Sequence, residues 1–189
     1  MTAKESQQEL VKLWQECRKE LEDLFYYCEE EDLKKRLPKK GSWSITEVLF
    51  HINLVNGHYL KGMPKPESLA SADEGRSLKR SFIGKQLEKS MRLKSDGSMK
   101  MKLKSPSVSD PIKAQKRGHA AVEKVIFREV LTDLDQIKSY IDLVADKKLE
   151  AAKVPSLLPI LKLNAADVLF VTLVHELRHL AQARRILEA

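Results

Sequence analysis

Residues 164–187 read NAADVLFVTLVHELRHLAQARRIL, and this stretch indicates the fold class of the chain. Asn164 is a residue type that caps helix N-termini, and Asp167 follows three positions later, which predicts a helix over 165–187. The first half of this helix is apolar on nearly every face, so we expect it to be the most buried helix. Such a helix needs other helices around it.

Two further segments repeat apolar residues three and four positions apart, which is the spacing of one helix face. They predict a helix over about 5–31 and another over about 119–145. The first apolar face consists of Leu10, Trp14, Cys17, Leu21, Leu24 and Cys28. The second consists of Val122, Ile126, Val130, Leu134, Ile137, Ile141 and Val144.

A fourth helix is predicted over about 45–61. Ser44 and Glu47 form a capping box, in which each side chain bonds to the other residue's backbone amide. Trp43, just before the cap, is placed to pack on Val48 as a hydrophobic staple. The start of this helix is therefore well defined.

Residues 62–110 contain Pro, Gly and Ser clusters, with a short helix expected at about 77–92. Asp110-Pro111 suits a helix start, but Gly118 weakens that turn, and no segment shows the alternation of a strand. The sequence thus predicts an all-α fold with a single domain over 1–189. We expect a four-helix bundle in which the long connection leaves the second and third helices parallel.

Composition fits one soluble globular domain, with 42% hydrophobic and 32% charged residues. The polar N-terminus lacks a secretory signal and the longest apolar run is far too short to span a membrane, so we expect a cytoplasmic protein. Cys17 and Cys28 would lie roughly 16 Å apart on one helix, too far for a disulfide. They are predicted to be buried thiols.

The net charge of +7 is concentrated in residues 61–114, which contain thirteen Lys or Arg against six Asp or Glu. This segment is either a solvated basic connection or a site for phosphate or another anion. Within 77–111 its only aromatic residue is Phe82, so it lacks the aromatic platform of single-strand binding proteins. Nucleic acid and membrane partners are not expected.

The last predicted helix contains His175-Glu176-Leu177-Arg178-His179, an H-E-x-x-H string. Histidines four residues apart lie one turn apart on one face and suit two ligands of one metal ion. The alternatives are a zinc protease, another metal site, or two ordinary histidines. A protease of the usual kinds needs a further ligand downstream, but only ten residues follow His179. A third ligand must come from upstream.

The upstream candidates are His51, His58 and His119. His51 is preferred because it lies inside a well-defined helix, with Glu47 one turn behind it to orient the ring. His58 is two turns further along and too distant to share a small ion with His51. His58 and His119 are expected to be ordinary polar histidines.

Three stretches together resemble the DinB/YfiT-like superfamily, in its DinB_2 branch: GSWSITEVLFHI (41–52), KMKLKSPSVSDP (100–111) and HELRHLAQARRIL (175–187). The resemblance extends over essentially the whole chain. It implies a four-helix bundle of up-down-down-up topology and a metal held by His51, His175 and His179. It also implies a homodimer and activities of the metal-dependent thiol-S-transferase or hydrolase type, without protease activity.

The leading hypothesis is a divalent-metal-binding protein, a transferase or hydrolase acting on a small molecule, with a low-molecular-weight thiol as a candidate cosubstrate. Three imidazoles suit Zn²⁺, which lowers the pKa of a bound water or thiol, but also Ni²⁺, Co²⁺ or Fe²⁺. Glu47 and Glu176 are the candidate catalytic carboxylates, as general bases or ring-orienting groups. The rival hypothesis is a non-enzymatic binding module that captures an anionic partner through residues 61–114.

Overall fold

The structure is a computed structural model of the 189-residue chain, described here for residues 2–73, 77–94, 105–119, 124–158 and 160–189. Four long helices dominate it: α1 (Ala3–Tyr27), α2 (Ile45–Gly62), α5 (Val125–Leu143) and α6 (Ala165–Leu187). Helix α6 packs against α1 and α2, and α5 packs against the same two helices on the other side. The helices therefore surround a shared core.

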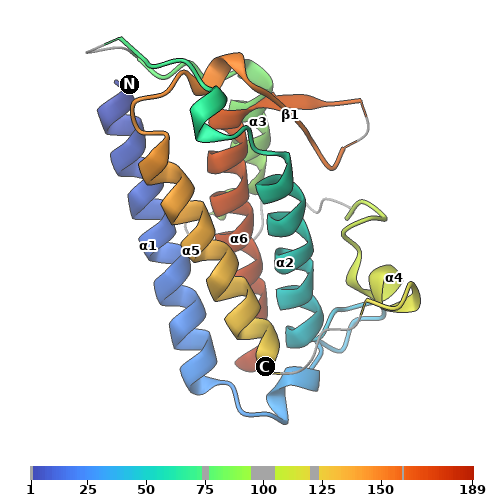
Figure 1. Ribbon diagram of the computed structural model, residues 1–189. Coiled ribbons are helices and arrows are strands. Elements are labelled where there is room, and N and C mark those ends of the chain that lie inside the picture. The colour runs from blue at the N-terminus through green and yellow to red at the C-terminus, as the bar shows by residue number, and fades with distance from the viewer. Residues whose placement is uncertain (1, 74–76, 95–104, 120–123, 159) are drawn as a thin grey trace.

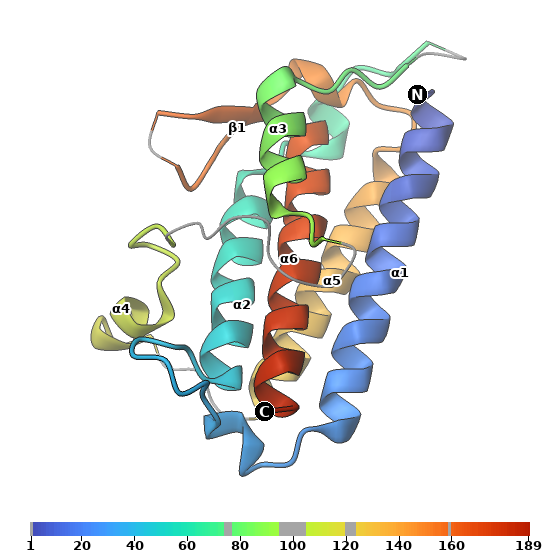
Figure 2. The same ribbon diagram turned by 180° about the vertical axis from the view of Figure 1, so that it is seen from behind.

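The chain direction in these helices is visible in Figures 1 and 2. The chain descends through α1, rises through α2, rises again through α5 and descends through α6. Helices α2 and α5 thus run parallel, and the end of α2 and the start of α5 lie at opposite ends of the molecule.

The starts of α2 and α6 agree with the sequence prediction. Ser44 accepts a hydrogen bond from the Glu47 amide at 3.2 Å, and the Glu47 carboxylate accepts one from the Ser44 amide at 2.9 Å. The Asn164 side chain accepts from the Asp167 amide at 2.7 Å. These caps satisfy amides that the first helical turn leaves without partners.

Helix α1 ends at Tyr27, so the prediction that it reaches residue 31 was wrong. The backbone becomes extended at Cys28, and the Glu29 amide donates to the Asp32 carboxylate at 2.9 Å. This local bond starts a separate short turn, Asp32–Lys34. Cys28 stays buried, and both cysteines are free thiols as predicted.

The helix predicted over 119–145 is also shorter in the structure. Helix α5 covers Val125–Leu143, and residues 120–123 lie outside the described part. The Asp110-Pro111 pair does open a helix, α4 (Pro111–Lys116), with the Asp110 carboxylate accepting from the Lys113 amide. Gly118, at φ +86°, lies just beyond its end, where a side chain would be strained.

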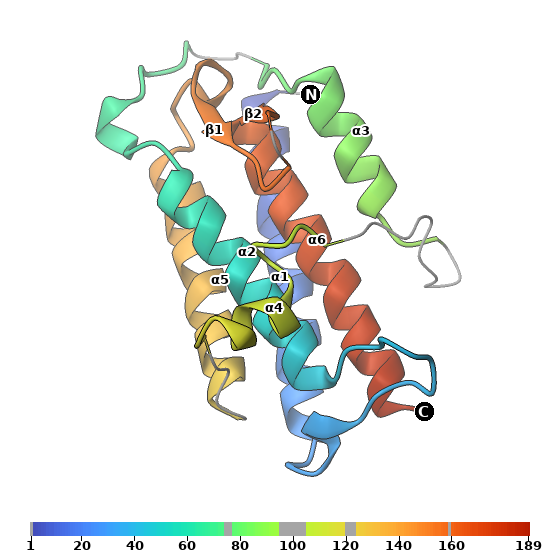
Figure 3. The same ribbon diagram turned by 90° about the vertical axis from the view of Figure 1, so that its right-hand side faces the viewer.

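The short helix expected at 77–92 is α3 (Phe82–Met91), capped by Ser81. It packs on α6, and α4 packs on α2, so both lie outside the four long helices (Figure 3). Close packing fixes α3: a Cβ on Gly84 would lie 2.1 Å from Cγ of Asp167 on α6.

The sequence pattern predicted no strands, and this prediction was wrong. Strands β1 (Lys153–Pro155) and β2 (Lys162–Asn164) form an antiparallel hairpin that pairs Val154 with Leu163. Three residues per strand are too few to show a two-residue period, so sequence pattern alone does not reveal it. The fold is mostly helical with one small sheet.

Helix α6 is the most buried helix, as its apolar first half predicts. Its residues 165–174 are all buried, and Phe170 and Leu173 are completely enclosed. In the described part of the chain, no helix combines the length and apolar character required for a membrane span.

Candidate metal centre

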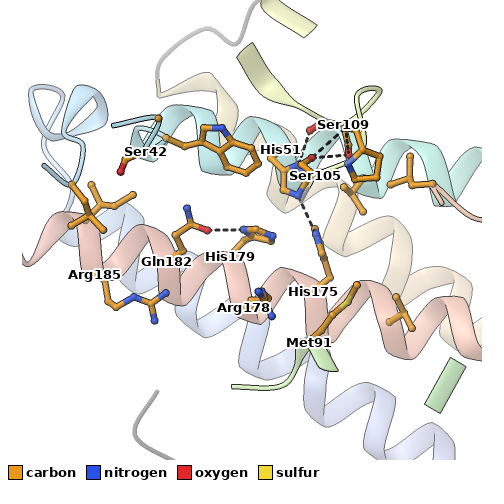
Figure 4. Close-up of a pocket in the computed structure, with 18 of the residues that line it drawn as sticks. Ser42, His51, Met91, Ser105, Ser109, His175, Arg178, His179, Gln182 and Arg185 are labelled. Carbon is orange, nitrogen blue, oxygen red and sulfur yellow. Dashed lines mark hydrogen bonds between the residues drawn. The ribbon is translucent and has the colours of Figure 1, made fainter. Parts of the chain in front are cut away.

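Three histidines from two helices converge beside α6 (Figure 4). His51 projects from α2, and His175 and His179 project from one face of α6. One ring nitrogen from each lies within 4.8 Å of the others. The structure thus brings together the three residues that the sequence selected as metal ligands.

The closest approach joins Nε2 of His51 to Nε2 of His175, at 3.1 Å. Two nitrogens bound to one tetrahedral Zn²⁺ at about 2.0–2.1 Å would be about 3.3 Å apart. The ring centroids of His175 and His179 are 4.4 Å apart, and those of His51 and His179 are 4.6 Å apart. The spacing fits a single ion bound by all three rings.

The other ring nitrogens determine which tautomer each histidine adopts. His51 Nδ1 lies 2.6 Å from the Ser109 carbonyl oxygen, which only accepts, so Nδ1 donates its proton there. His179 Nδ1 likewise donates to Gln182 Oε1 at 3.0 Å. Both Nε2 atoms therefore present lone pairs, the arrangement found in metal-binding histidines.

Burial disfavours the charged form of all three rings. Burial lowers the pKa of His51, and it lowers the pKa values of His175 and His179 well below the ordinary value, with the neighbouring histidines adding to the effect. Nδ1 of His175 is buried and lacks a hydrogen-bond partner among the described residues. Each nitrogen of a neutral ring offers either a lone pair or an N–H, so nitrogens in this arrangement can share a proton or bind a cation.

The histidines line a cavity of about 480 Å³, large enough for a small molecule. Trp43, from the loop before α2, packs over His51 with a centroid distance of 4.9 Å and lies 6.3 Å from His179. Met91 of α3 and Leu157 of the hairpin also line the cavity. Segments from three separate parts of the sequence therefore line the cavity around the histidines.

Neither candidate catalytic carboxylate lines this cavity. Both carboxylate oxygens of Glu47 accept hydrogen bonds from the Arg36 guanidinium, at 2.6 and 2.8 Å, and one of them also accepts from the Ser44 amide in the helix cap. Glu176 is fully buried and accepts from Asn56 Nδ2 at 3.0 Å; burial raises its pKa to about 8. Each carboxylate is adjacent to the site in sequence but is directed elsewhere.

The other two histidines lie outside the group of three. Nε2 of His58 lies 3.2 Å from the Pro155 carbonyl oxygen, and His119 is exposed near the end of α4. Sequence reasoning missed Ser109 and Gln182, which hold the ring nitrogens. Gln182 had a detectable signal, since it follows His179 by three residues on the same helix face.

The basic segment 61–114 is only partly described, because residues 74–76 and 95–104 lie outside the described part. Two of its described arginines bind acids of this chain. Arg80 pairs with Glu88 and Asp167, and Arg92 pairs with Glu88 and Glu9. Capture of an anionic partner by this segment remains a prediction.

Comparison with known proteins gives one match. No curated protein and no solved structure matches the chain. The family model of the DinB superfamily matches residues 9–183, from α1 to near the end of α6, and includes all three clustered histidines. With a match over most of its length, the chain belongs to the DinB superfamily.

Proposed function

We propose that this protein binds one divalent metal ion through His51, His175 and His179, and that it is a metal-dependent transferase of the thiol-S-transferase type or a hydrolase. The main support is the convergence of three imidazoles, from α2 and α6, at a cavity of about 480 Å³. Family membership supports the same reading. Zn²⁺, Ni²⁺, Co²⁺ and Fe²⁺ all suit this donor set.

A divalent ion in this position would supply Lewis acidity that lowers the pKa of a water or thiol towards neutrality. The residues of the chain prepare the site for it. The Ser109 carbonyl and Gln182 fix the rings of His51 and His179. Trp43 and the apolar residues of the lining give the cavity a largely apolar wall, and a less polar environment strengthens electrostatic interactions.

We propose positioning roles for the two carboxylates. Glu47 fixes the first turn of α2, one turn before His51, through the cap and Arg36. Glu176 holds α6 to α2 through Asn56, next to His175. Their contacts direct both side chains away from the cavity, so general-base catalysis by either one is not supported by this arrangement.

The remaining proposals follow from family membership and the arrangement of α1, α2, α5 and α6. We propose a single domain over 1–189, a four-helix bundle of up-down-down-up topology, and a homodimer in the cytoplasm. The substrate would be a small molecule, with a low-molecular-weight thiol as cosubstrate in the transferase case. A sedimentation measurement would test the dimer.

Metal titration of untagged, chelator-treated protein tests the site. We expect one Zn²⁺, Ni²⁺ or Fe²⁺ per chain by calorimetry and elemental analysis, and loss of that binding in His51→Ala, His175→Ala and His179→Ala. His58→Ala is the control and should bind like the parent. Binding that survives all three cluster substitutions would contradict the ligand assignment.

Activity assays with the reconstituted protein separate the two reactions. Transferase activity would appear as thiol loss when a thiol and an aryl halide electrophile are supplied together. Hydrolase activity would appear with ester substrates and no thiol. Either activity should disappear in His51→Ala and persist in His58→Ala; activity that is unchanged in His51→Ala would exclude this site as its source.

A further inference from the structure

The cavity beside the histidines has two halves that differ in chemistry. Helix α2 rises and α6 descends, so residues that follow His51 on α2 lie on the same side as residues that precede His175 on α6. On that side α2 contributes Val55 and Tyr59 to the lining, and α6 contributes Val171. These side chains are apolar apart from the Tyr59 hydroxyl.

Helix α3 places another apolar side chain on the same side. Gly84 packs against Asp167 near the start of α6, where an added Cβ would lie 2.1 Å from the Asp167 Cγ. Further along α3, the Ser90 carbonyl accepts a hydrogen bond from Nη1 of Arg178 at 3.4 Å. Leu87 lies midway between these two contacts on α3 and lines the cavity. It is therefore level with the part of α6 just before the histidines.

The hairpin formed by β1 and β2 contributes to the same side of the cavity. Strand β2 ends at Asn164, the cap of α6, so the hairpin lies at the start of that helix (Figure 3). Leu157 and Leu158, which follow β1, line the cavity. The Tyr59 hydroxyl interacts with the Leu157 backbone and the Ser156 side chain, so the hairpin supplies its polar partners. We define the apolar half of the cavity as Val55, Tyr59, Leu87, Leu157, Leu158 and Val171.

The other half of the cavity is more polar. Figure 4 shows Ser42, Gln182 and Arg185 together beyond the histidines, toward the end of α6. Lys39 and Lys40, from the loop before α2, line the cavity as well. Among the described lining residues, no charged side chain belongs to the apolar half. The histidines thus lie between an apolar half and a polar half.

The length of the apolar half sets the size of the group that it can hold. Tyr59 follows His51 by eight residues, which is about 12 Å along α2. An extended carbon chain advances roughly 1.25 Å per bond, since three bonds join Cα atoms about 3.8 Å apart. A group of about eight carbons would therefore reach from the histidines to the Tyr59 ring.

We propose that the apolar half binds an uncharged alkyl or aryl group of the substrate, up to about eight carbons long. This rests on the proposed function and deepens it, because the reacting end of the same molecule would lie at the histidines. Apolar groups gain from leaving water, whereas a polar group in this half would lose its hydrogen bonds to water without replacement. The apolar half itself requires no metal, so it can be tested on metal-free protein.

A series of 1-alkanols from butanol to decanol measures the apolar half directly. In calorimetric titrations of chelator-treated protein, the affinity should rise about fourfold per added CH₂, as expected for a CH₂ group that leaves water. The rise should stop near eight carbons, where the chain meets the Tyr59 ring. Affinity that does not depend on chain length would overturn the proposal.

A matched pair of probes tests the selection against polar groups. The diol 1,8-octanediol differs from 1-octanol by one hydroxyl at the far end of the chain. That hydroxyl would be buried without a partner, so we expect the diol to bind at least about fivefold more weakly. Equal binding of the diol and 1-octanol would overturn the proposal.

Two substitutions should shorten the chain that the apolar half accepts. Leu87→Trp on α3 and Leu157→Trp in the hairpin each enlarge a half-buried side chain of its lining. In each variant the rise in alkanol affinity should stop at least about two carbons earlier, so 1-octanol should bind at least about tenfold more weakly. Because the two positions lie on different elements, each variant checks the other.

Two further tryptophan variants are the matched controls. Leu37→Trp enlarges a lining residue near Lys39, in the polar half, and Ile83→Trp enlarges an exposed residue of α3. Both should bind the alkanol series like the parent. A series like that of the parent in both Leu87→Trp and Leu157→Trp would overturn the proposal, and so would equal shortening in Leu37→Trp.

The two proposals fail separately. If the alkanol series is flat while zinc binding still requires His51, the apolar subsite is wrong and the metal site stands. If the series rises and stops as expected while zinc does not bind, the apolar subsite stands and the metal site is wrong.

Discussion

Two polar clusters connect α6 to its neighbours, and they differ in how their charges are satisfied. Near the start of α6, Arg80 binds the carboxylates of Glu88 and Asp167, and we call these three residues the arginine cluster. Further along, the histidine cluster (His51, His175 and His179) brings one ring nitrogen from each residue within 4.8 Å of the others. One cluster contains both signs of charge, and the other contains bases alone.

This difference separates a structural contact from a candidate binding site. Asp167 is fully buried, accepts from the Ser81 amide at 3.1 Å and lies under the Arg80 guanidinium, which also covers Phe170 at 4.0 Å. Opposite charges that satisfy each other need no further ligand. Converging imidazoles without an acid partner among the described residues form an arrangement that a cation would complete.

The largest effect is expected when the arginine cluster is broken. Asp167→Ala leaves the Arg80 side chain, which is 8% exposed, without one of its carboxylates. Removing one partner of a buried ion pair costs about 3–5 kcal/mol in the free energy of unfolding, measurable by urea denaturation. Asp135→Ala, which breaks the exposed pair with Arg18, is the control and should cost less than about 1 kcal/mol. Equal losses would contradict the structural role of the cluster.

The histidine cluster should respond to metal instead. A ligand at a hundredfold excess over its Kd stabilises the native state by about 2.7 kcal/mol, which corresponds to several degrees in Tm for a chain of this size. His51→Ala, His175→Ala and His179→Ala should each abolish most of the rise seen by differential scanning calorimetry. Metal-free parent should already be folded and helical. If His58→Ala and His119→Ala abolished the rise equally, the cluster would not be its cause.

These clusters also show what the sequence could reveal. The helix bounds of α2 and α6 and the choice of His51 over His58 followed from caps and spacing, which are local properties. Ser109 was not foreseen as the partner of His51, because the two residues are 58 positions apart and only tertiary packing joins them. The directions of Glu47 and Glu176 were not foreseen either. Arg36 and Asn56 determine them, and nothing in the H-E-x-x-H string indicates that.

Gly84 provides a smaller test of how tightly α3 is held at the arginine cluster. A Cβ there would lie 2.1 Å from Asp167 Cγ, so Gly84→Ala should destabilise by about 1–3 kcal/mol through overpacking. Gly57 in α2 has no atom within 4 Å of such a Cβ. Gly57→Ala should therefore stabilise by about 0.5–1 kcal/mol, since Ala is the better helix former. The opposite signs, measured by urea denaturation, are the result to check.

Another small effect is predicted for Asp133 on α5, a carboxylate held by an amide rather than by a guanidinium. Asn53 Nδ2 donates to it at 2.9 Å, and burial raises its pKa to about 6. The ordinary value in an unfolded chain is about 3.9.

Because the folded-state pKa is the higher one, the folded protein binds a proton that the unfolded chain has already released between pH 4 and 6. The stability gained from neutral Asp133 is complete below about pH 3.9 and is lost as pH rises through about 6.

Asn cannot ionise, so Asp133→Asn should gain stability relative to the parent as pH rises from 4 to 8. The side chain is partly exposed, so solvent screening reduces the expected gain to about 1 kcal/mol. Asp142→Asn, at an exposed position on the same helix, is the matched control, and urea denaturation of both variants at pH 4 and 8 is the measurement. A gain that is the same at both pH values would show that ionisation of Asp133 does not cause it.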